Sequence, residues 1–339
     1  MPRRTALLVG INYRGTADEL NGCYNDVVNV ATYLRTVLGY APAAITMLTD
    51  GNRGSAFPAS VAPTRQNILA GLSALVAGIA SGDEAVFHFS GHGTLVRDTN
   101  GDEVSGMDSC LCPLDYNAPA SAGGGVITDD EIRALLVNRV PRGARLYVIL
   151  DCCHNGTGCD IRYKYEDFSV LLRPPSARTA PLWRTQQKAF ANGKYAETAG
   201  EVYMISGCRD EQTSADAYIN NAFAGALTYA VFAILRANQA AIRTYSWSAL
   251  LRDVRYFMRV NRYDQIPQLM TGQLITPAAA VFPGLAAKRG VGGGGSLELG
   301  IGSGSRGLAV EAPTTTTLFG FKPKPKSGAN TRQAIQFLH

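Results

Sequence analysis

The chain of 339 residues is 46% hydrophobic and 17% charged, which excludes a wholly disordered protein and allows one large core or two modest ones. Its net charge of +5 falls in residues 284–339, where seven Lys and Arg face two Asp and Glu. Because that tail is rich in Gly, Ser, Thr and Lys-Pro repeats, we predict disorder there and no nucleic-acid partner.

Targeting and cysteine patterns narrow the class of protein further. No apolar run is long enough for a membrane helix, and the apolar stretch after Met1 is too short for a secretory signal. The seven cysteines lack the spacing of a disulfide framework, and the four histidines form no HExxH zinc motif. We therefore expect a cytoplasmic, soluble protein with reduced thiols and no membrane partner.

Short apolar runs alternate with helical patterns along the chain. Strands are predicted at residues 6–9, 45–48, 85–89, 146–150 and 202–205, and helices at 27–38, 68–79, 223–237 and 247–260. A further helix opens at Thr128, where Glu131 completes a capping box. This alternation is typical of an α/β fold in which helices cover both faces of a mostly parallel sheet.

Two of these predicted strands end in residues that can perform chemistry. His92 follows the third predicted strand, and Cys152 and Cys153 follow the fourth. Because ligands bind at the carboxyl ends of parallel strands, this placement favours a Cys/His dyad in which the imidazole activates a thiolate. The backbone amides of Gly93 and Cys153 would then be oxyanion donors. The alternative is a structural histidine and an inert buried cysteine.

The motifs Ser90-Gly91-His92-Gly93 and Asp151-Cys152-Cys153-His154 resemble the catalytic core of metacaspases, which are caspase-like cysteine peptidases. The similarity covers residues 5–283 and includes the motifs at 7–13, 20–26, 113–115, 205–208 and 265–269. It implies a caspase-like α/β/α sandwich with His92 as base, Cys153 as nucleophile and a structural Cys152. Asn155 stands where the family usually has Ser.

The resemblance also implies an order of segments similar to type I members. A large-subunit-like block would span residues 1–173, an exposed intersubunit segment 174–199, a small-subunit-like block 200–283, and the tail 284–339. We expect this protein to lack the proline-rich N-terminal extension of many type I members. Any recruitment function of that extension is therefore not carried over.

A substrate pocket follows from the same resemblance, which places Cys23, Asp26, Ser90 and Asp151 around the side chain that precedes the scissile bond. Two carboxylates in one cleft favour a cation, so the implied substrates are polypeptides cleaved after Arg or Lys. The alternative is that Asp26 is an ordinary acidic residue at the start of a helix and that Asp151 caps a turn.

A calcium site is implied as well, because Asp108, Asp129, Asp130 and Asp160 align with the calcium-binding aspartates of type I metacaspases. Hard oxygen ligands suit Ca²⁺. Asp129 and Asp130 could instead be ordinary acids in the first turn of a helix. The stretch after Asp98 imitates an EF-hand opening, but Glu103 replaces its glycine, so that loop is not an EF-hand.

The sequence therefore predicts a monomeric, calcium-stimulated cysteine endopeptidase that cleaves after Arg or Lys and acts in programmed cell death. Two alternatives stay open. One is a caspase-like pseudoenzyme that serves as a scaffold, and the other is a caspase-like peptidase of different specificity, for instance for Asp or Asn.

Overall fold

An eight-stranded sheet forms the centre of the protein in a computed structural model, which describes residues 2–51, 61–101, 103, 105–153, 158–167, 183–187, 197–207, 216–219, 222–276 and 278–283. The strands lie in the order β2-β1-β3-β7-β10-β13-β8-β9. Their bounds in that order are Ile45–Thr49, Arg4–Gly10, Glu84–Ser90, Arg145–Asp151, Glu201–Ser206, Gln268–Thr271, Tyr163–Asp167 and Trp183–Gln187.

The five strands predicted from the apolar runs are all present and lie side by side as β2, β1, β3, β7 and β10, all parallel. This confirms the mostly parallel sheet. The three strands beyond β10 are antiparallel to their neighbours and were not predicted. One of them, β9, falls inside the segment 174–199, so part of that segment extends the central sheet.

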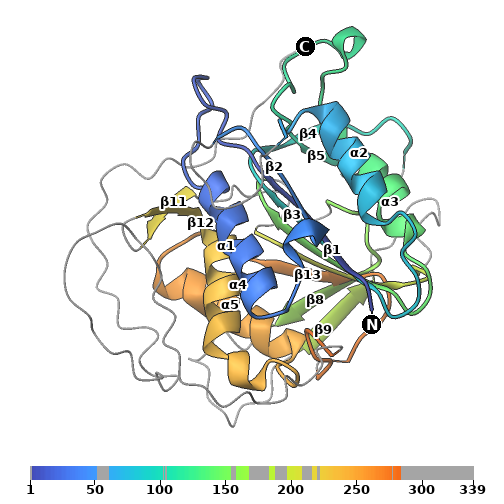
Figure 1. The fold of residues 1–339 in the computed structure, drawn as a ribbon, viewed down its shortest axis with the longest axis vertical. Coiled ribbons are helices and arrows are strands. Elements are labelled where there is room, and N and C mark those ends of the chain that lie inside the picture. The colour runs from blue at the N-terminus through green and yellow to red at the C-terminus, as the bar shows by residue number, and fades with distance from the viewer. Residues whose placement is uncertain are drawn as a thin grey trace.

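Helices cover both faces of the sheet, as Figure 1 shows. On one face lie α1 (Cys23–Thr36), α4 (Ala226–Ala237) and α5 (Trp247–Val260), and on the other lie α2 (Arg65–Leu75) and α3 (Asp129–Leu135). The strands alternate accordingly, since Leu8 joins the core under α1 whereas Leu7 and Val9 join the core under α2. The predicted α/β/α sandwich is therefore confirmed.

Two smaller sheets flank the carboxyl edge of the parallel strands. One consists of β4 (Gly93–Arg97), β5 (Met107–Leu111) and β6 (Ile127–Thr128), and the other pairs β11 (Asp216–Ile219) with β12 (Ala222–Gly225). The helix predicted to start at residue 223 therefore begins three residues later, after β12. Consequently α4 starts at the edge where the predicted chemistry lies.

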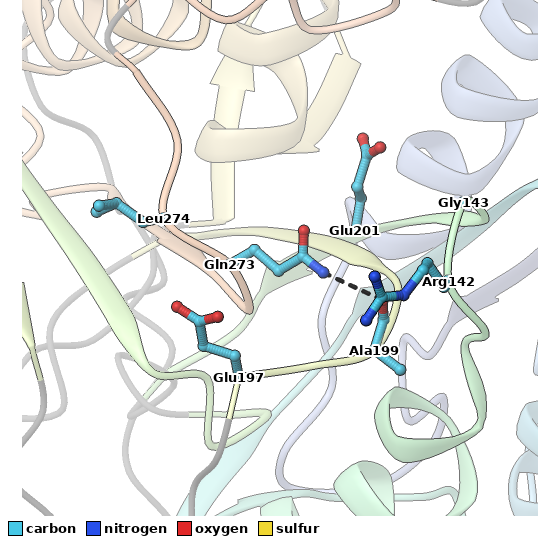
Figure 2. Close-up of a pocket in the computed structure, with 7 residues that line it drawn as sticks. All are labelled: Arg142, Gly143, Glu197, Ala199, Glu201, Gln273 and Leu274. Carbon is cyan, nitrogen blue, oxygen red and sulfur yellow. Dashed lines mark hydrogen bonds between the residues drawn. The ribbon is translucent and has the colours of Figure 1, made fainter.

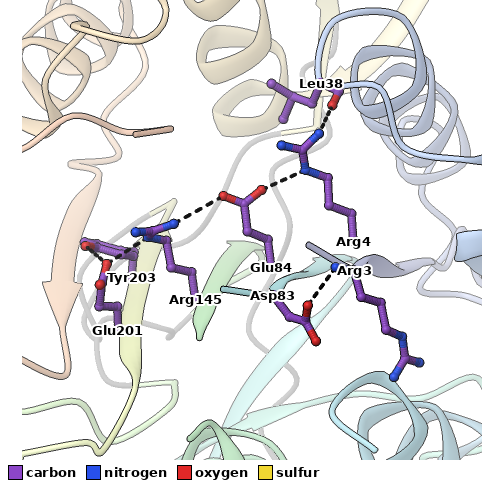
Figure 3. Close-up of polar contacts among 8 residues, drawn as sticks. All are labelled: Arg3, Arg4, Leu38, Asp83, Glu84, Arg145, Glu201 and Tyr203. Atoms are coloured by element: carbon purple, nitrogen blue, oxygen red, sulfur yellow. Dashed lines mark hydrogen bonds and ion pairs between the residues drawn. The ribbon is translucent and has the colours of Figure 1, made fainter. Parts of the chain in front are cut away.

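The amino edge of the parallel strands is joined by ion pairs (Figure 3). The Glu84 carboxylate lies 3.0 Å from Arg4 Nε and 3.6 Å from Arg145 Nη1. Arg145 Nε in turn lies 3.0 Å from Glu201 Oε2, which also accepts a hydrogen bond from the Tyr203 hydroxyl. Because the Glu84 side chain is only 7% exposed, these contacts link β1, β3, β7 and β10 by charges largely shielded from water.

Within the described part of the chain, no helix has both the length and the apolar character needed to cross a membrane. The predicted disordered tail, residues 284–339, lies outside the described residues, and so do His154 and Asn155.

Candidate active site

His92 and Cys153 leave the central sheet from neighbouring strands. In the parallel pairing of β3 with β7, Ser90 lies opposite Asp151, and each candidate follows its strand by two residues. The Gly91 amide donates to the Asp151 carbonyl and so joins the ends of the two strands. Both candidates are buried, His92 with 3% of its surface exposed and Cys153 with none. The structure thus brings them to one edge of the sheet.

The imidazole of His92 is oriented by a backbone carbonyl. Its Nε2 lies 2.7 Å from the carbonyl oxygen of Asp18. Because a carbonyl oxygen can only accept, Nε2 carries the proton in the neutral ring, and Nδ1 keeps the lone pair that a base needs. The Asp18 carboxylate also accepts a hydrogen bond of 2.6 Å from the Tyr116 hydroxyl, which ties this loop to the body of the protein.

Tyr13 contacts the same histidine through both its hydroxyl and its ring. Its hydroxyl accepts a hydrogen bond from the His92 amide at 2.9 Å and donates to the Cys112 carbonyl at 2.5 Å. The two rings of Tyr13 and His92 have centroids 4.7 Å apart. Tyr13 is buried and has a φ of 51°, a strained conformation for a bulky residue. Burial raises the pKa of its hydroxyl well above the usual value, so the group stays a donor.

The predicted substrate-pocket residues lie together and are fully buried. Asp26, on α1, accepts a hydrogen bond of 2.6 Å from the Ser90 hydroxyl and a bifurcated one from the Gly225 amide to both its oxygens. Asp151, at the end of β7, accepts a hydrogen bond of 2.8 Å from the Thr228 amide at the start of α4. These contacts join α1, β3, β7 and α4 around two carboxylates. Cys23, the fourth predicted residue, begins α1 and is buried as well.

The predicted oxyanion donors lie just beyond the same edge. Gly93 begins β4 and pairs with Leu111 of β5, and Cys153 follows β7. Cys112, the residue after β5, donates its amide to the His92 carbonyl at 3.1 Å. Burial raises the pKa of the Cys112 thiol, so this neighbouring cysteine is protonated at neutral pH. The assignment of Gly93 and Cys153 as oxyanion donors stays a prediction.

A group of three carboxylates lies at the start of α3. Oxygen atoms of Glu103, Asp129 and Asp160 lie within 4.8 Å of one another, and both aspartates are buried. Asp129 Oδ2 accepts from the Ser109 amide at 3.0 Å, and the Asp160 carbonyl accepts from the Arg133 guanidinium. An all-oxygen set of this kind fits Ca²⁺.

The structure treats the four predicted calcium ligands unequally. Asp129 and Asp160 belong to the three-carboxylate group, whereas Asp108 and Asp130 do not. Asp108 is buried on β5 next to Ser109, and Asp130 accepts a hydrogen bond from the Asn100 side chain. The third member of the group, Glu103, is the residue whose presence argued against an EF-hand.

Several residues of the site escaped the sequence analysis. Tyr13 lies in a motif that carried the resemblance, but nothing in its pattern showed that its hydroxyl reaches His92. Asp18 acts through its backbone carbonyl, which has no signature in the sequence. Gly225 and Thr228 act through backbone amides and belong to a segment predicted as continuous helix. Of these residues, only Glu103 could have been found from the sequence, because it is an acidic residue close to other acidic residues.

A pocket of about 620 Å³ lies at the opposite, amino edge of the sheet (Figure 2). It is lined by residues including Arg142, Glu197, Glu201 and Gln273, whose side-chain amide donates to the Ala199 carbonyl. None of the predicted site residues lines it. The dyad and its acidic pair therefore lie apart from this open, polar pocket.

Comparison with known proteins identifies the family of this chain. The family model described as metacaspase, peptidase C14 domain, matches residues 4–162. Metacaspase-1 of Yarrowia lipolytica is 34% identical over 295 residues, which cover 79% of this chain and 61% of that protein. Metacaspase-1 of Mycosarcoma maydis is 36% identical over 301 residues, which cover 80% of this chain and 71% of that protein.

A solved structure supports the fold. The crystal structure of a Geobacter sulfurreducens protein matches 82% of this chain and 96% of its own, with a TM-score of 0.53 and 24% sequence identity. At that identity the match concerns the fold alone. The curated relatives carry the family assignment, which confirms the resemblance found in the motifs: the chain belongs to the metacaspase family of peptidases.

Proposed function

We propose that this protein is a cysteine endopeptidase that cleaves polypeptides after Arg or Lys, with Cys153 as nucleophile and His92 as base. The observation that carries the proposal is the placement of two buried carboxylates, Asp26 and Asp151, at the same sheet edge as the dyad. A cationic side chain bound between them would place the following peptide bond near the ends of β3 and β7.

The dyad supplies the chemistry. With Nε2 held on the Asp18 carbonyl, Nδ1 of His92 is the nitrogen that can take the Cys153 proton. The thiolate attacks the substrate carbonyl carbon, and the imidazolium then donates the proton to the leaving amine. His92 then takes a proton from water, the resulting hydroxide attacks the acyl carbon, and Cys153 leaves as a thiolate that His92 can reprotonate. Backbone amides of Gly93 and Cys153 would stabilise the oxyanion.

A peptide-library cleavage profile tests the proposal. We expect cleavage after Arg and Lys and none after Asp, because an anionic side chain would be repelled by two carboxylates. Efficient cleavage after Asp would overturn the acidic-pocket argument and favour a peptidase of different specificity. No turnover of any peptide, at any calcium concentration, would favour the scaffold alternative.

Calcium stimulation is part of the same proposal. Glu103, Asp129 and Asp160 would hold the ion, and Arg133 on the Asp160 carbonyl offsets part of their charge. Asp160 lies seven residues after Cys153, so an ion at this group would order the chain that leaves the nucleophile. Activity measured against free Ca²⁺, together with calorimetric binding, tests this step. Full activity in excess chelator without a calcium heat would contradict it.

A further inference from the structure

Gly225 lies where the two pocket carboxylates meet. A Cβ atom on this residue would lie 2.1 Å from Asp151 Oδ2 and 2.7 Å from Asp26 Oδ2. Both distances are far below van der Waals contact, so the two carboxylates converge on the position that the missing side chain leaves open. The backbone does not require glycine there, because φ of −66° and ψ of 132° are ordinary for any residue. Glycine is therefore required at position 225 by the lack of space for a side chain and not by the backbone conformation.

The segment that carries Gly225 also holds both carboxylates in place. The Gly225 amide donates to Asp26 Oδ1 at 2.9 Å and Oδ2 at 3.0 Å, and the Thr228 amide donates to Asp151 Oδ2 at 2.8 Å. These amides belong to the first turn of α4 and its cap, where backbone N–H groups lack partners within the helix. The Thr228 hydroxyl lies 3.1 Å from Nε2 of the buried His88, which fixes this turn on β3.

We propose that Gly225 is a specificity-determining residue, because its missing side chain lets Asp26 and Asp151 form one dianionic site for a guanidinium or ammonium group. This inference rests on the proposed Arg/Lys specificity and adds a residue to it. A methyl group at position 225 would force at least one carboxylate away from the other. The cation would then lose one of its two anionic partners, whereas the dyad beyond the ends of β3 and β7 would stay in place.

A pair of peptides that differ only in charge tests the proposal. One has Arg before the scissile bond, and the other has citrulline, which replaces the guanidinium by a neutral urea of the same shape. For Gly225→Ala we expect the Arg-to-citrulline ratio of kcat/KM to fall about 10- to 100-fold, the value of a hydrogen bond to a charged group. Alkylation of Cys153 by iodoacetamide should keep its wild-type rate, because the substitution does not touch the dyad.

Gly272→Ala is the matched control. Its Cβ would lie 2.1 Å from Thr198 Oγ1, so it is overpacked to the same degree, but it follows β13 at the amino edge of the sheet. This variant should keep the wild-type Arg-to-citrulline ratio. An unchanged ratio in Gly225→Ala, or an equal fall in Gly272→Ala, would overturn the proposal. A wild-type ratio near one would instead refute the Arg/Lys specificity itself.

A double variant keeps the test decisive if Gly225→Ala does not fold. Asp151→Ala removes the carboxylate that the new Cβ would meet most closely. In that background the contact of the new Cβ with Asp26 Oδ2 at 2.7 Å remains, but the closer one is gone. Gly225→Ala should therefore lower kcat/KM for the Arg peptide by less than about tenfold, because the effects of contacting residues are not additive. A tenfold or larger further loss in the Asp151→Ala background would show that Gly225 acts independently of Asp151 and overturn the proposal.

Discussion

At the scale of single residues, the site depends on groups that hold the dyad as much as on the dyad itself. His92 is fixed at three points: its Nε2 on the Asp18 carbonyl, its amide on the Tyr13 hydroxyl, and its ring against the Tyr13 ring. The strained φ of Tyr13 is tolerated because its hydroxyl also donates to the Cys112 carbonyl. We infer that Tyr13 is a positioning residue for His92.

Tyr13→Phe should lower kcat by about 3- to 30-fold and leave KM nearly unchanged. The hydroxyl makes hydrogen bonds of ordinary strength to the His92 amide and the Cys112 carbonyl. Its loss should therefore disturb the orientation of the base and so the rate of the chemical step rather than substrate binding. Steady-state kinetics with an Arg peptide measures the split between the two constants. Tyr33→Phe is the control, since the buried Tyr33 hydroxyl has no hydrogen-bond partner among the residues that the structure describes, and its loss should leave both constants unchanged. A rise in KM alone would contradict the positioning role.

Adjacent cysteines permit a direct test of the nucleophile. Cys153→Ala should abolish peptide cleavage, because it deletes the attacking sulfur, whereas Cys152→Ala should keep most activity. Both side chains are fully buried, so both variants lose a similar amount of packing. The thermal midpoint of each variant, measured beside its activity, separates folding from chemistry. Activity lost only in the residue 152 variant would reverse the assignment.

At the scale of elements, the start of α3 connects the capping pattern in the sequence to the proposed calcium site. The predicted capping box is present, with Thr128 Oγ1 accepting from the Glu131 amide and Glu131 Oε2 accepting from the Thr128 amide. That box fixes the first turn of α3, and Asp129 in this turn points into the three-carboxylate group. The sequence could predict the helix start because its determinants are local.

The proposed calcium ligands were less predictable, because they come from three separate segments. Glu103 precedes β5, Asp129 begins α3 and Asp160 follows Cys153. Alignment to a family supplies two of them, but a loop residue such as Glu103 joins the group only through the tertiary fold. The same limit applies to Gly225, whose role comes from carboxylates on α1 and β7.

Glu103→Gln should weaken calcium binding more than Asp130→Asn does. Glu103 contributes a carboxylate oxygen to the three-residue group, whereas Asp130 lies outside it and contacts the Asn100 side chain. Removal of one charged ligand should raise the calcium Kd about tenfold or more. Titration calorimetry of both variants provides the measurement. A larger effect in Asp130→Asn would assign the ion to the aspartates expected from the family alone.

At the scale of the whole molecule, the sequence predicted the parallel half of the sheet and missed the antiparallel half. Buried parallel strands are continuous apolar runs, and the run at Leu146–Leu150 is an example. The strand β8 instead alternates Tyr163, Lys164 and Tyr165, and β9 has a polar sequence. β8 pairs with β13, which lies more than a hundred residues further along the chain, and β9 pairs with β8. Local patterns do not specify such pairings.

The assembled sandwich also predicts how stability depends on pH. Burial raises the pKa of several tyrosines, and the largest effects include those at Tyr40 and Tyr147 in the core under α1. At Tyr40 the charge of Glu84 raises the pKa further, and Arg4 opposes it. A pKa that is higher in the folded state means that the unfolded chain loses its proton first. The associated stability is therefore complete below the unfolded tyrosine pKa, about 10, and is lost as pH rises above it.

We expect the free energy of unfolding to fall steeply above pH 10, by about 1.4 kcal/mol per pH unit for each such tyrosine. Tyr40→Phe removes one titrating group, so the slope of the unfolding free energy with pH should become shallower by about 1.4 kcal/mol per pH unit. Val30→Ala, in the same core, should lower stability equally at every pH and keep the slope. Denaturant unfolding at pH 8, 10 and 11 measures both. Identical slopes in Tyr40→Phe and wild type would mean that Tyr40 ionises in the folded protein near its ordinary pKa, and that the core at the ends of β1 and β3 admits water.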